Sequence, residues 1–435
     1  MTWSLNRFEK KIKNSLEKIT GFSSGCCSSF LLFFPTRDTA SLFPDLLPIL
    51  TPIETPPKAN DKKMKKNMKP DQIAVFISPH GFGHAARASA VMEAWKSKNN
   101  LIYFNIFTTI PRWFFQDSLS DKFDYFALLT DIGLVQKTPF HEDLEETIYQ
   151  LDHFLPFHPE MKTEFAKKLT KARCALVLCD ISPLGIAIAK QAGIPSVLIE
   201  NFTWDWIYEE YNEAAPRLAE HIHYLRAVFN AADFHIQTEP VCARKPVNLT
   251  VMPVSRKFRT PRNSIRKQLN LSPDSKMVLI TTGGIKEQIE FLDKLKQLQD
   301  IYFVIPGGGE TFRRDRNVIL LPHHSDFFHP DLVNASDAVV GKAGYSTIAE
   351  VYHANVPFGY VSRPDFRESH KLEAFIQKEM TGFPIESSEF QSGGWVSKVE
   401  ELLSLTPPEK KTPDEAGRIA NYLDNVLRQH HSEST

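Results

Sequence analysis

The sequence is most informative at GKAGYSTIAE, residues 341–350. The apolar run before it (337–340) is typical of a short buried strand, and the residues after it continue as a helix. A strand, a glycine turn and a helix start direct backbone N–H groups and the positive end of the helix dipole at one point, which suits phosphate. Ser346 and Thr347 can cap the helix or donate to a phosphate oxygen, and Glu350 can accept hydrogen bonds from a ribose diol. The stretch predicts a nucleotide site, with an ordinary capped helix as the alternative.

Length and composition limit the class of protein. A chain of 435 residues is too long for one ordinary domain, so two domains and additional segments are expected. With 42% hydrophobic and 24% charged residues the composition is globular, and the formal net charge of -1 disfavours a general nucleic-acid binder. The five cysteines form no C-x-x-C array, so no metal site is expected, and this sparse set is typical of a reducing, cytoplasmic environment.

Residues 1–70 differ from the rest of the chain. Apolar clusters alternate with prolines over 34–57, and a basic run follows over 58–69. The apolar part is too short to span a bilayer and lacks the compact core of a signal peptide. We interpret the segment as a disordered or non-native extension, with translation starting at Met64 or Met68. A peripheral membrane contact through the lysines is the alternative to a solvated charge run.

A second glycine loop occurs near the start of the folded part. The strand-like run at 73–78 leads into PHGFGHAAR (79–87), and a helical pattern follows. The loop matches G-x-G-x-x-A, which raises the possibility of dinucleotide binding. No carboxylate follows the next strand (102–108), where a dinucleotide's ribose would need one, so this interpretation is disfavoured.

Two histidines bracket the glycines of this loop. His80 and His84 lie on either side of Gly81 and Gly83. A histidine at a helix start beside a cleft is well placed to act as a general base near neutral pH. The alternative is that both histidines bond to backbone groups of the loop.

A third stretch of interest is ENFTWDWIY, residues 200–208, which follows an apolar strand-like run at 196–199. Ligand crevices in open α/β sheets lie at the carboxyl ends of the strands. Asn201, Trp204 and Asp205 are therefore candidates for the acceptor side of a cleft. Aromatic packing between domains explains the same composition equally well.

The chain divides at a Pro- and Arg-rich segment, residues 252–261, which we interpret as a linker. Before it, 142–172 has helical periodicity. After it, a new strand-like run ends in Gly283 and Gly284. The predicted fold is α/β, with two Rossmann-like doubly wound domains facing a cleft. The expected segments are an N-terminal acceptor domain at 71–252, a nucleotide-sugar domain at 263–412, and a C-terminal helix and tail at 413–435, with the helix packing back on the first domain.

Four motifs in this order resemble GT-B glycosyltransferases, and more closely the glycosyltransferase-like N-terminal domain of plant L-arabinokinases. The motifs are GFGHAAR (81–87), NFTWDWIY (201–208), GKAGYSTIAE (341–350) and PFGYVSRPDFRE (357–368). The similarity covers about 72–425. The chain is more distantly similar to the peptidoglycan-precursor N-acetylglucosaminyltransferases. The galactokinase-like half of the arabinokinases has no counterpart here, so the resemblance implies no sugar-kinase activity.

The resemblance also implies roles for single residues. His84 matches a histidine that activates the acceptor hydroxyl or touches the donor phosphate, and Glu350 matches the acid that binds the ribose. The diphosphate-binding helix start corresponds to Gly344, Ser346 and Thr347. The loop that closes over the phosphates corresponds to Gly283 and Gly284. Catalysis would need no metal ion or other cofactor, and the leaving nucleotide would be stabilised by the helix dipole and by Lys342 and Arg363.

Three functions remain open. The first is a hexosyl- or pentosyltransferase that moves a sugar from a nucleotide-sugar, with a UDP-sugar expected, to an unidentified acceptor. The second is a non-catalytic sugar-nucleotide binding or regulatory module, which would bind without turnover. The third is a nucleotide-sugar epimerase, since fold alone does not determine function. An epimerase would want further carboxylates in the cleft, for which the candidates are Asp180, Glu200 and Asp205.

Overall fold

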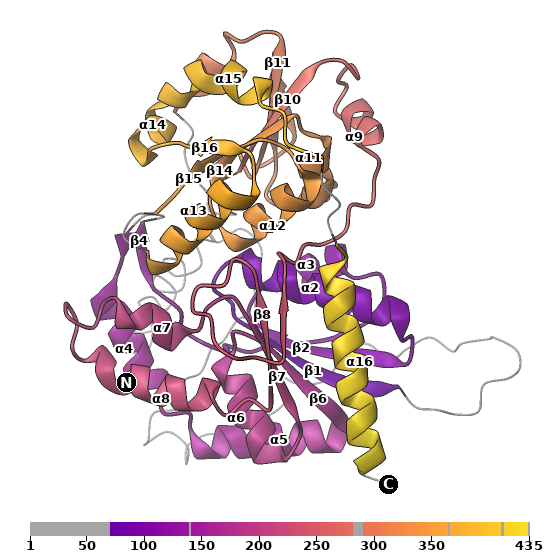
Figure 1. Cartoon of the computed structure of the whole chain (residues 1–435), viewed down its shortest axis with the longest axis vertical. Helices are drawn as coiled ribbons and strands as arrows, with labels where there is room; N and C mark the ends of the chain where they lie inside the picture. The colour runs from indigo at the N-terminus through magenta and orange to yellow at the C-terminus, as the bar shows by residue number, and fades with distance from the viewer. Residues whose placement is uncertain (1–69, 139–140, 282–289, 364–365, 410–412, 434–435) are drawn as a thin grey trace, which may run out of the picture.

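The computed structural model describes residues 70–138, 141–281, 290–363, 366–409 and 413–433 (Figure 1). Two predicted features lie outside these ranges. They are the N-terminal extension up to residue 69, and the phosphate-loop glycines Gly283 and Gly284. The described chain forms two α/β domains, each built on its own seven-stranded sheet.

The first sheet has the strand order β3-β2-β1-β6-β7-β8-β9, and all of its strand pairs are parallel. Its strands are β1 (Asp71–Ile77), β2 (Ile102–Thr108), β3 (Asp124–Ala127), β6 (Cys174–Asp180), β7 (Ser196–Glu200), β8 (Phe234–Thr238) and β9 (Leu249–Val251). Its helices are α2 (Phe82–Lys98), α3 (Arg112–Ser118), α4 (Leu144–Phe154), α5 (Pro159–Ala172), α6 (Pro183–Ala192), α7 (Trp204–Glu209) and α8 (Leu218–Phe229). A separate hairpin consists of β4 (Gln136–Thr138) and β5 (His141–Glu142).

The two faces of this sheet are buried in different cores. Alternate side chains of a strand point to opposite faces, so Ile73, Val75 and Ile77 of β1 join one core, whereas Ala74 and Phe76 join the other. A strand buried on both faces needs a continuous apolar run, which explains the composition of β1.

The second sheet has the order β12-β13-β11-β10-β14-β15-β16, and it is parallel except that β12 runs antiparallel to β13. Its strands are β10 (Lys276–Thr281), β11 (Ile301–Pro306), β12 (Arg313–Asp315), β13 (Val318–Leu321), β14 (Ala338–Lys342), β15 (Phe358–Val361) and β16 (Gly382–Pro384). Its helices are α9 (Arg262–Gln268), α10 (Leu292–Leu295), α11 (His329–Ala335), α12 (Tyr345–Ala354), α13 (Arg367–Glu379), α14 (Ser387–Ser392), the 3₁₀ helix η2 (Gly394–Lys398) and α15 (Val399–Ser404).

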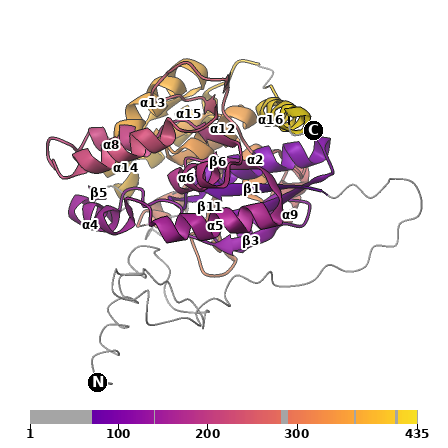
Figure 2. The ribbon, with the colours of Figure 1, turned by 90° about the horizontal axis from the view of Figure 1, so that it is seen from below.

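The chain then returns to the first domain. Helix α16 (Glu415–Glu433) lies beside α2 in both views (Figures 1 and 2). Its residues Ile419 and Leu423 are buried in the same core as Trp95 of α2. The chain therefore crosses between the domains twice, once through residues 252–261 and once before α16.

The predicted fold class, two Rossmann-like doubly wound α/β domains, is confirmed. The segment 142–172, predicted to be helical in character, forms two helices, α4 and α5. The chain leaves the helical path at 155–158, between α4 and α5. Pro156 lies in this break and Pro159 opens α5, and proline has no backbone N–H to continue the hydrogen bonds of a preceding helix.

Candidate functional site

Two helix starts meet where the domains face each other. A Cβ on Gly83, in the first turn of α2, would stand 3.8 Å from the Ser346 Oγ in the first turn of α12. Within the described residues, no side chain caps either helix, and both first turns carry only neutral or basic residues. The partial positive charges of two helix dipoles therefore converge on one point. Gly81 has a φ of 79°, which a glycine adopts without strain, and this turns the chain sharply from β1 into α2.

Side-chain cations add to this positive field. Burial, followed by the charge of Arg363, that of His84 when it is protonated, and that of Lys342, lowers the pKa of His80 to about 3. Arg363 lies just after β15 and is itself buried, with the Phe366 ring 3.9 Å from its guanidinium carbon. Its carboxylate neighbour, the Oε1 of Glu142 in the β4–β5 hairpin, is 3.9 Å from the Nη1 of Arg363. A bound anion would relieve the cost of gathering these charges.

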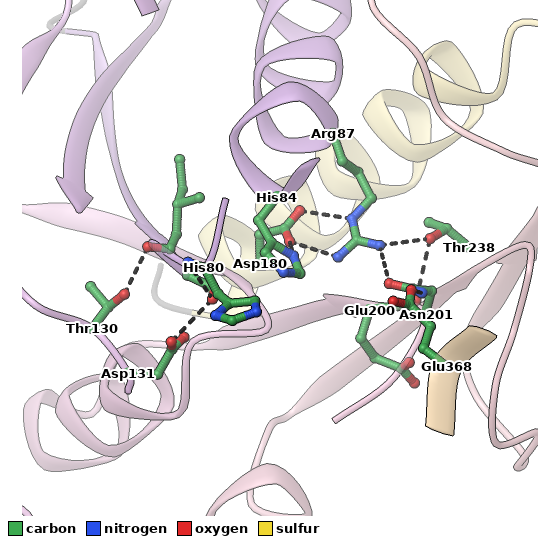
Figure 3. A network of polar contacts seen from close by, with 12 residues as sticks. His80, His84, Arg87, Thr130, Asp131, Asp180, Glu200, Asn201, Thr238 and Glu368 are labelled. Atoms are coloured by element: carbon green, nitrogen blue, oxygen red, sulfur yellow. Dashed lines mark hydrogen bonds and ion pairs between the residues drawn. The ribbon is translucent and has the colours of Figure 1, made fainter. Parts of the chain in front are cut away.

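His84 is held by a buried carboxylate at the end of β6 (Figure 3). Its Nδ1 lies 3.2 Å from the Oδ1 of Asp180, and both side chains are almost completely buried. Arg87, one turn further along α2, donates to both oxygens of Asp180, at 2.9 Å from Nε and 2.6 Å from Nη2. Burial alone would raise the pKa of Asp180, but Arg87 and then His84 hold it below its usual value.

This arrangement assigns the proton of His84. An ionised Asp180 can only accept hydrogen bonds, so the Nδ1 of His84 carries the proton and donates it. The Nε2 then keeps its lone pair and can accept a proton. The pair thus has the form of a general base held in place by a second group.

The network continues from Arg87 into the second domain. Arg87 Nη1 donates to the Oδ1 of Asn201 at 2.9 Å and to the Oγ1 of Thr238 at 3.1 Å. Asn201 in turn donates through Nδ2 to the Oε1 of Glu368, in the first turn of α13, at 2.7 Å. The ring of Tyr345, which opens α12, lies 4.6 Å from the guanidinium carbon of Arg87. Helices α12 and α13 of the second domain are therefore connected to the residues that hold His84.

His80 is closely packed between two neighbours, Trp204 and Gly133. Its ring lies edge-on to Trp204, with 5.0 Å between the ring centroids, and a Cβ on Gly133 would come within 2.6 Å of its Nδ1. Asp131 lies near His80 (Figure 3), and its Oδ1 accepts a hydrogen bond from the Ser78 hydroxyl at 3.1 Å. Burial raises the pKa of Asp131 to about 8, so this carboxyl is mostly protonated at neutral pH.

Only some side chains of the aromatic stretch after β7 contact the second domain. Trp204 is 1% exposed and belongs to the core of the first domain, and Asp205 pairs with Arg226 of α8 at 3.3 Å. Asn201 reaches Glu368, as described above, and Trp206 packs under the guanidinium of Arg367, 4.1 Å from ring centroid to carbon. Of the two explanations of this stretch, packing accounts for Trp204, whereas Asn201 lies where the domains meet.

Glu350 lies one turn into α12 and is buried. Its Oε1 accepts a hydrogen bond from the Nη2 of Arg256 at 3.0 Å, and its Oε2 lies 2.6 Å from the Nδ1 of His329. Burial would raise the pKa of Glu350, but His329 and Arg256 hold it below the usual value. The carboxylate is thus charged and bonded at both oxygens.

Sequence reasoning did not assign roles to Arg87, Arg256, His329 and Glu368, and it listed Asp180 only as a spare carboxylate. Arg87 had a recognisable signal, since it follows His84 by three residues and so lies on the same helix face. Glu368 ends a motif that was quoted for its resemblance. Arg256 and His329 had no recognisable signal in the sequence, because they contact Glu350 from distant parts of the chain.

The described residues contain neither a metal-binding cluster nor a membrane-spanning helix. No group of three or more His, Cys, Asp or Glu side chains in the described ranges is arranged to hold a metal ion. Among the helices that the structure describes, none is long and apolar enough to cross a membrane.

Comparison with known sequences identifies relatives. No protein-family model matches the chain. The chain is 28% identical over 346 residues to L-arabinokinase of Arabidopsis thaliana; the match covers 77% of this chain but only 32% of the length of that relative. It is 21% identical over 325 residues to an uncharacterized glycosyltransferase of Methanopyrus kandleri, covering 65% of this chain and 87% of the relative.

Solved structures show the same fold. The spinosyn forosaminyltransferase SpnP superposes with a TM-score of 0.51 at 13% identity, covering 84% of this chain and 95% of SpnP. MurG of Acinetobacter baumannii superposes with a TM-score of 0.50 at 15% identity, covering 82% of this chain and 100% of MurG. The chain therefore has the GT-B fold of glycosyltransferases, and the predicted resemblance is confirmed.

Proposed function

We propose that the protein is a glycosyltransferase that moves a sugar from a nucleotide-sugar, with a UDP-sugar as the expected donor, to an acceptor hydroxyl. The observation that carries this proposal is the meeting of two uncapped helix starts at Gly83 and Ser346. Such a point suits a diphosphate, because backbone N–H groups and dipoles from two sides stabilise its charge.

The donor would bind mainly to the second domain. Gly344, Ser346 and Thr347 form the α12 start that would take the diphosphate, with Lys342 and Arg363 close to it. Glu350 would accept hydrogen bonds from the ribose. Its bonds to Arg256 and His329 leave room for this, because each carboxylate oxygen has two lone pairs.

In the proposed reaction His84 is the general base. The acceptor oxygen attacks the anomeric carbon, the bond from that carbon to the diphosphate oxygen breaks, and the hydroxyl proton passes to the Nε2 of His84. The imidazolium that forms is stabilised by Asp180, which is already ionised. The electron pair leaves with the nucleoside diphosphate, whose charge the helix starts and cations stabilise. In this scheme the two helix starts, Lys342 and Arg363 balance the negative charge of the leaving diphosphate, and no metal ion is needed.

The epimerase alternative has little support from the site. Its three candidate carboxylates are all engaged in the first domain. Asp180 is bonded by Arg87 and Asp205 by Arg226. The Oε1 of Glu200 accepts from Gln237 at 2.9 Å and lies 2.8 Å from the Nε2 of His235.

A thermal-shift series on the full chain tests the donor site. UDP, GDP and TDP would be added in excess to the wild type, Glu350→Ala and His84→Ala, and each melt compared with that of the same variant without nucleotide. A ligand at 100 times its Kd stabilises a fold by about 2.7 kcal/mol, which is readily measured. We expect one nucleotide to shift the wild type and His84→Ala but not Glu350→Ala. If no nucleotide shifts the wild type, the proposal loses its main support.

Transfer assays then separate an enzyme from a binding module. The nucleotide-sugar identified by binding would be incubated with the wild type and with His84→Ala, with water as the substitute acceptor, and release of the nucleoside diphosphate by slow hydrolysis measured. Release by the wild type alone supports a transferase with His84 as its base. Tight binding with equal, background release by both proteins would favour the non-catalytic module.

A further inference from the structure

Arg256 belongs to the segment that links the two domains, yet its side chain is enclosed by both of them. Only a tenth of the side chain is exposed. Its guanidinium carbon lies 4.8 Å from the ring centroid of Phe114 in α3 and 4.8 Å from that of Phe328, which precedes α11. The guanidinium is thus within cation–π distance of one aromatic ring from each domain, and both contacts restrict its position.

The two terminal nitrogens of this guanidinium donate hydrogen bonds to different domains. Nη1 donates to the Oγ of Ser118, the last residue of α3, at 3.1 Å. Nη2 donates to the Oε1 of Glu350 in α12 at 3.0 Å. The fork of an arginine fixes the directions of both bonds at once. The position of Glu350 is therefore tied to the end of α3 through a single rigid group.

Glu350 is fixed at its second oxygen as well. The Oε2 lies 2.6 Å from the Nδ1 of His329. With one partner on each oxygen the carboxylate cannot rotate, and the lone pairs that remain lie in one fixed plane. Two adjacent acceptors in a fixed plane match a cis-diol, which presents two hydroxyls side by side. A freely rotating carboxylate would accept a single hydroxyl almost as well.

We propose that Arg256 is a specificity-determining positioning residue, which orients Glu350 so that the donor site distinguishes a ribonucleotide from a 2′-deoxyribonucleotide. This inference rests on the proposed function, in which Glu350 takes the ribose. A site built to bond a hydroxyl discriminates against the analogue without it. With the deoxynucleotide bound, Glu350 keeps Arg256 and His329, but a remaining lone pair of its buried carboxylate has neither the hydroxyl nor water as a donor.

Arg259 provides a matched control. Its guanidinium stacks on the same Phe328 ring at 4.2 Å and donates to the backbone carbonyls of Asp117 and Ser118 at the end of α3. Arg259 thus connects the linker to the end of α3 as Arg256 does. The residue that bonds to Glu350, however, is Arg256. Loss of Arg259 reports the general effect of loosening the linker.

The test compares the Kd values of UDP and 2′-deoxy-UDP for the full-length wild type, Arg256→Met and Arg259→Met by calorimetry at one salt concentration. We expect the wild type to prefer UDP by about tenfold, as a hydrogen bond to a charged group suggests. Arg256→Met should reduce this ratio to about twofold or less while still binding 2′-deoxy-UDP, which also shows that the variant is folded. Arg259→Met should keep the wild-type ratio.

The outcomes are distinguishable. If the wild type does not discriminate, if Arg256→Met keeps the wild-type ratio, or if Arg259→Met loses the ratio to the same degree, the role of Arg256 is overturned while the donor site stands. If the wild type binds neither nucleotide, the proposed function fails and this inference fails with it.

Discussion

The first turns of α2 and α12 face each other across the domain boundary and carry different chemistry. The early part of α2 holds His84 and Arg87, both anchored on the buried Asp180. The first turn of α12 holds the short side chains of Ser346 and Thr347, and its backbone N–H groups have no side-chain cap among the described residues. Both helices follow a parallel strand and a glycine, so their backbones begin alike.

The difference shows how one local motif can serve two purposes. Where ionisable side chains occupy the first turns and a buried carboxylate orders them, the helix start presents a group that can take a proton. Where the side chains are short, the N–H groups and the dipole remain for an anion. We call the side chains of His84 and Arg87 the α2 wall, and the helix start with Ser346 and Thr347 the α12 wall. We expect changes in the α2 wall to affect turnover, and changes in the α12 wall or in the space in front of it to affect binding.

Replacing His84 with glutamine should have the largest effect. Glutamine can still donate to Asp180 but has no basic nitrogen, so kcat should fall by about 10²–10⁴-fold. The Kd of the nucleoside diphosphate should change little, because the α12 wall is intact. Steady-state kinetics and calorimetry on the same preparation measure both quantities. A Kd that rises as much as kcat falls would show that α2 is also a binding wall.

Replacing Gly83 with leucine should block the meeting point of the two helix starts. A Cβ at this position makes an ordinary contact with Ser346 at 3.8 Å, but the remaining atoms of leucine would fill the space in front of α12. Nucleotide affinity should fall about tenfold or more, because an overpacked contact typically costs 1–3 kcal/mol. Gly83→Ala is the control and should bind like the wild type. Equal affinities for leucine and alanine would place the nucleotide elsewhere.

Replacing Asp131 with asparagine should have a smaller effect, and only on the pH dependence of stability. The pKa of Asp131 is raised to about 8 in the folded protein, above its ordinary value of about 3.8 in the unfolded chain. Between these pH values the folded state holds more protons, so stability falls as pH rises, by at most about 1.4 kcal/mol per pH unit. Asp131→Asn should flatten this part of the profile and keep an acceptor for Ser78. Parallel urea-midpoint profiles of the two proteins between pH 5 and 8 would contradict the assignment.

The sequence alone did not decide whether Trp204 lines a ligand crevice or is packed against other side chains. Its stretch could equally have lined a ligand crevice or packed between the domains, since both uses favour aromatic side chains. The structure buries Trp204 against Phe202 and Tyr208, with centroid distances of 5.2 Å and 5.9 Å. Composition does not separate these uses, because the choice depends on which neighbours enclose the ring.

The break between α4 and α5 was also not evident from the hydrophobic pattern of the sequence. Hydrophobic periodicity over 142–172 indicated helix correctly for most of the segment. It could not show the interruption, because the apolar spacing resumes in α5 on the far side of the break. Pro156 and Pro159 were the local signals, and they act through the missing N–H instead of through hydrophobicity.

By itself, the sequence determined the two doubly wound domains and the two glycine-led helix starts. Both follow from local rules, namely the period of apolar residues and the freedom of glycine before a helix. Only the tertiary structure decided which charges meet. Arg87 reaches Asp180 across 93 positions of sequence, and Arg256 reaches Glu350 across 94. Such pairs depend on distances that arise only when strands and domains assemble, and no spacing along the chain encodes them.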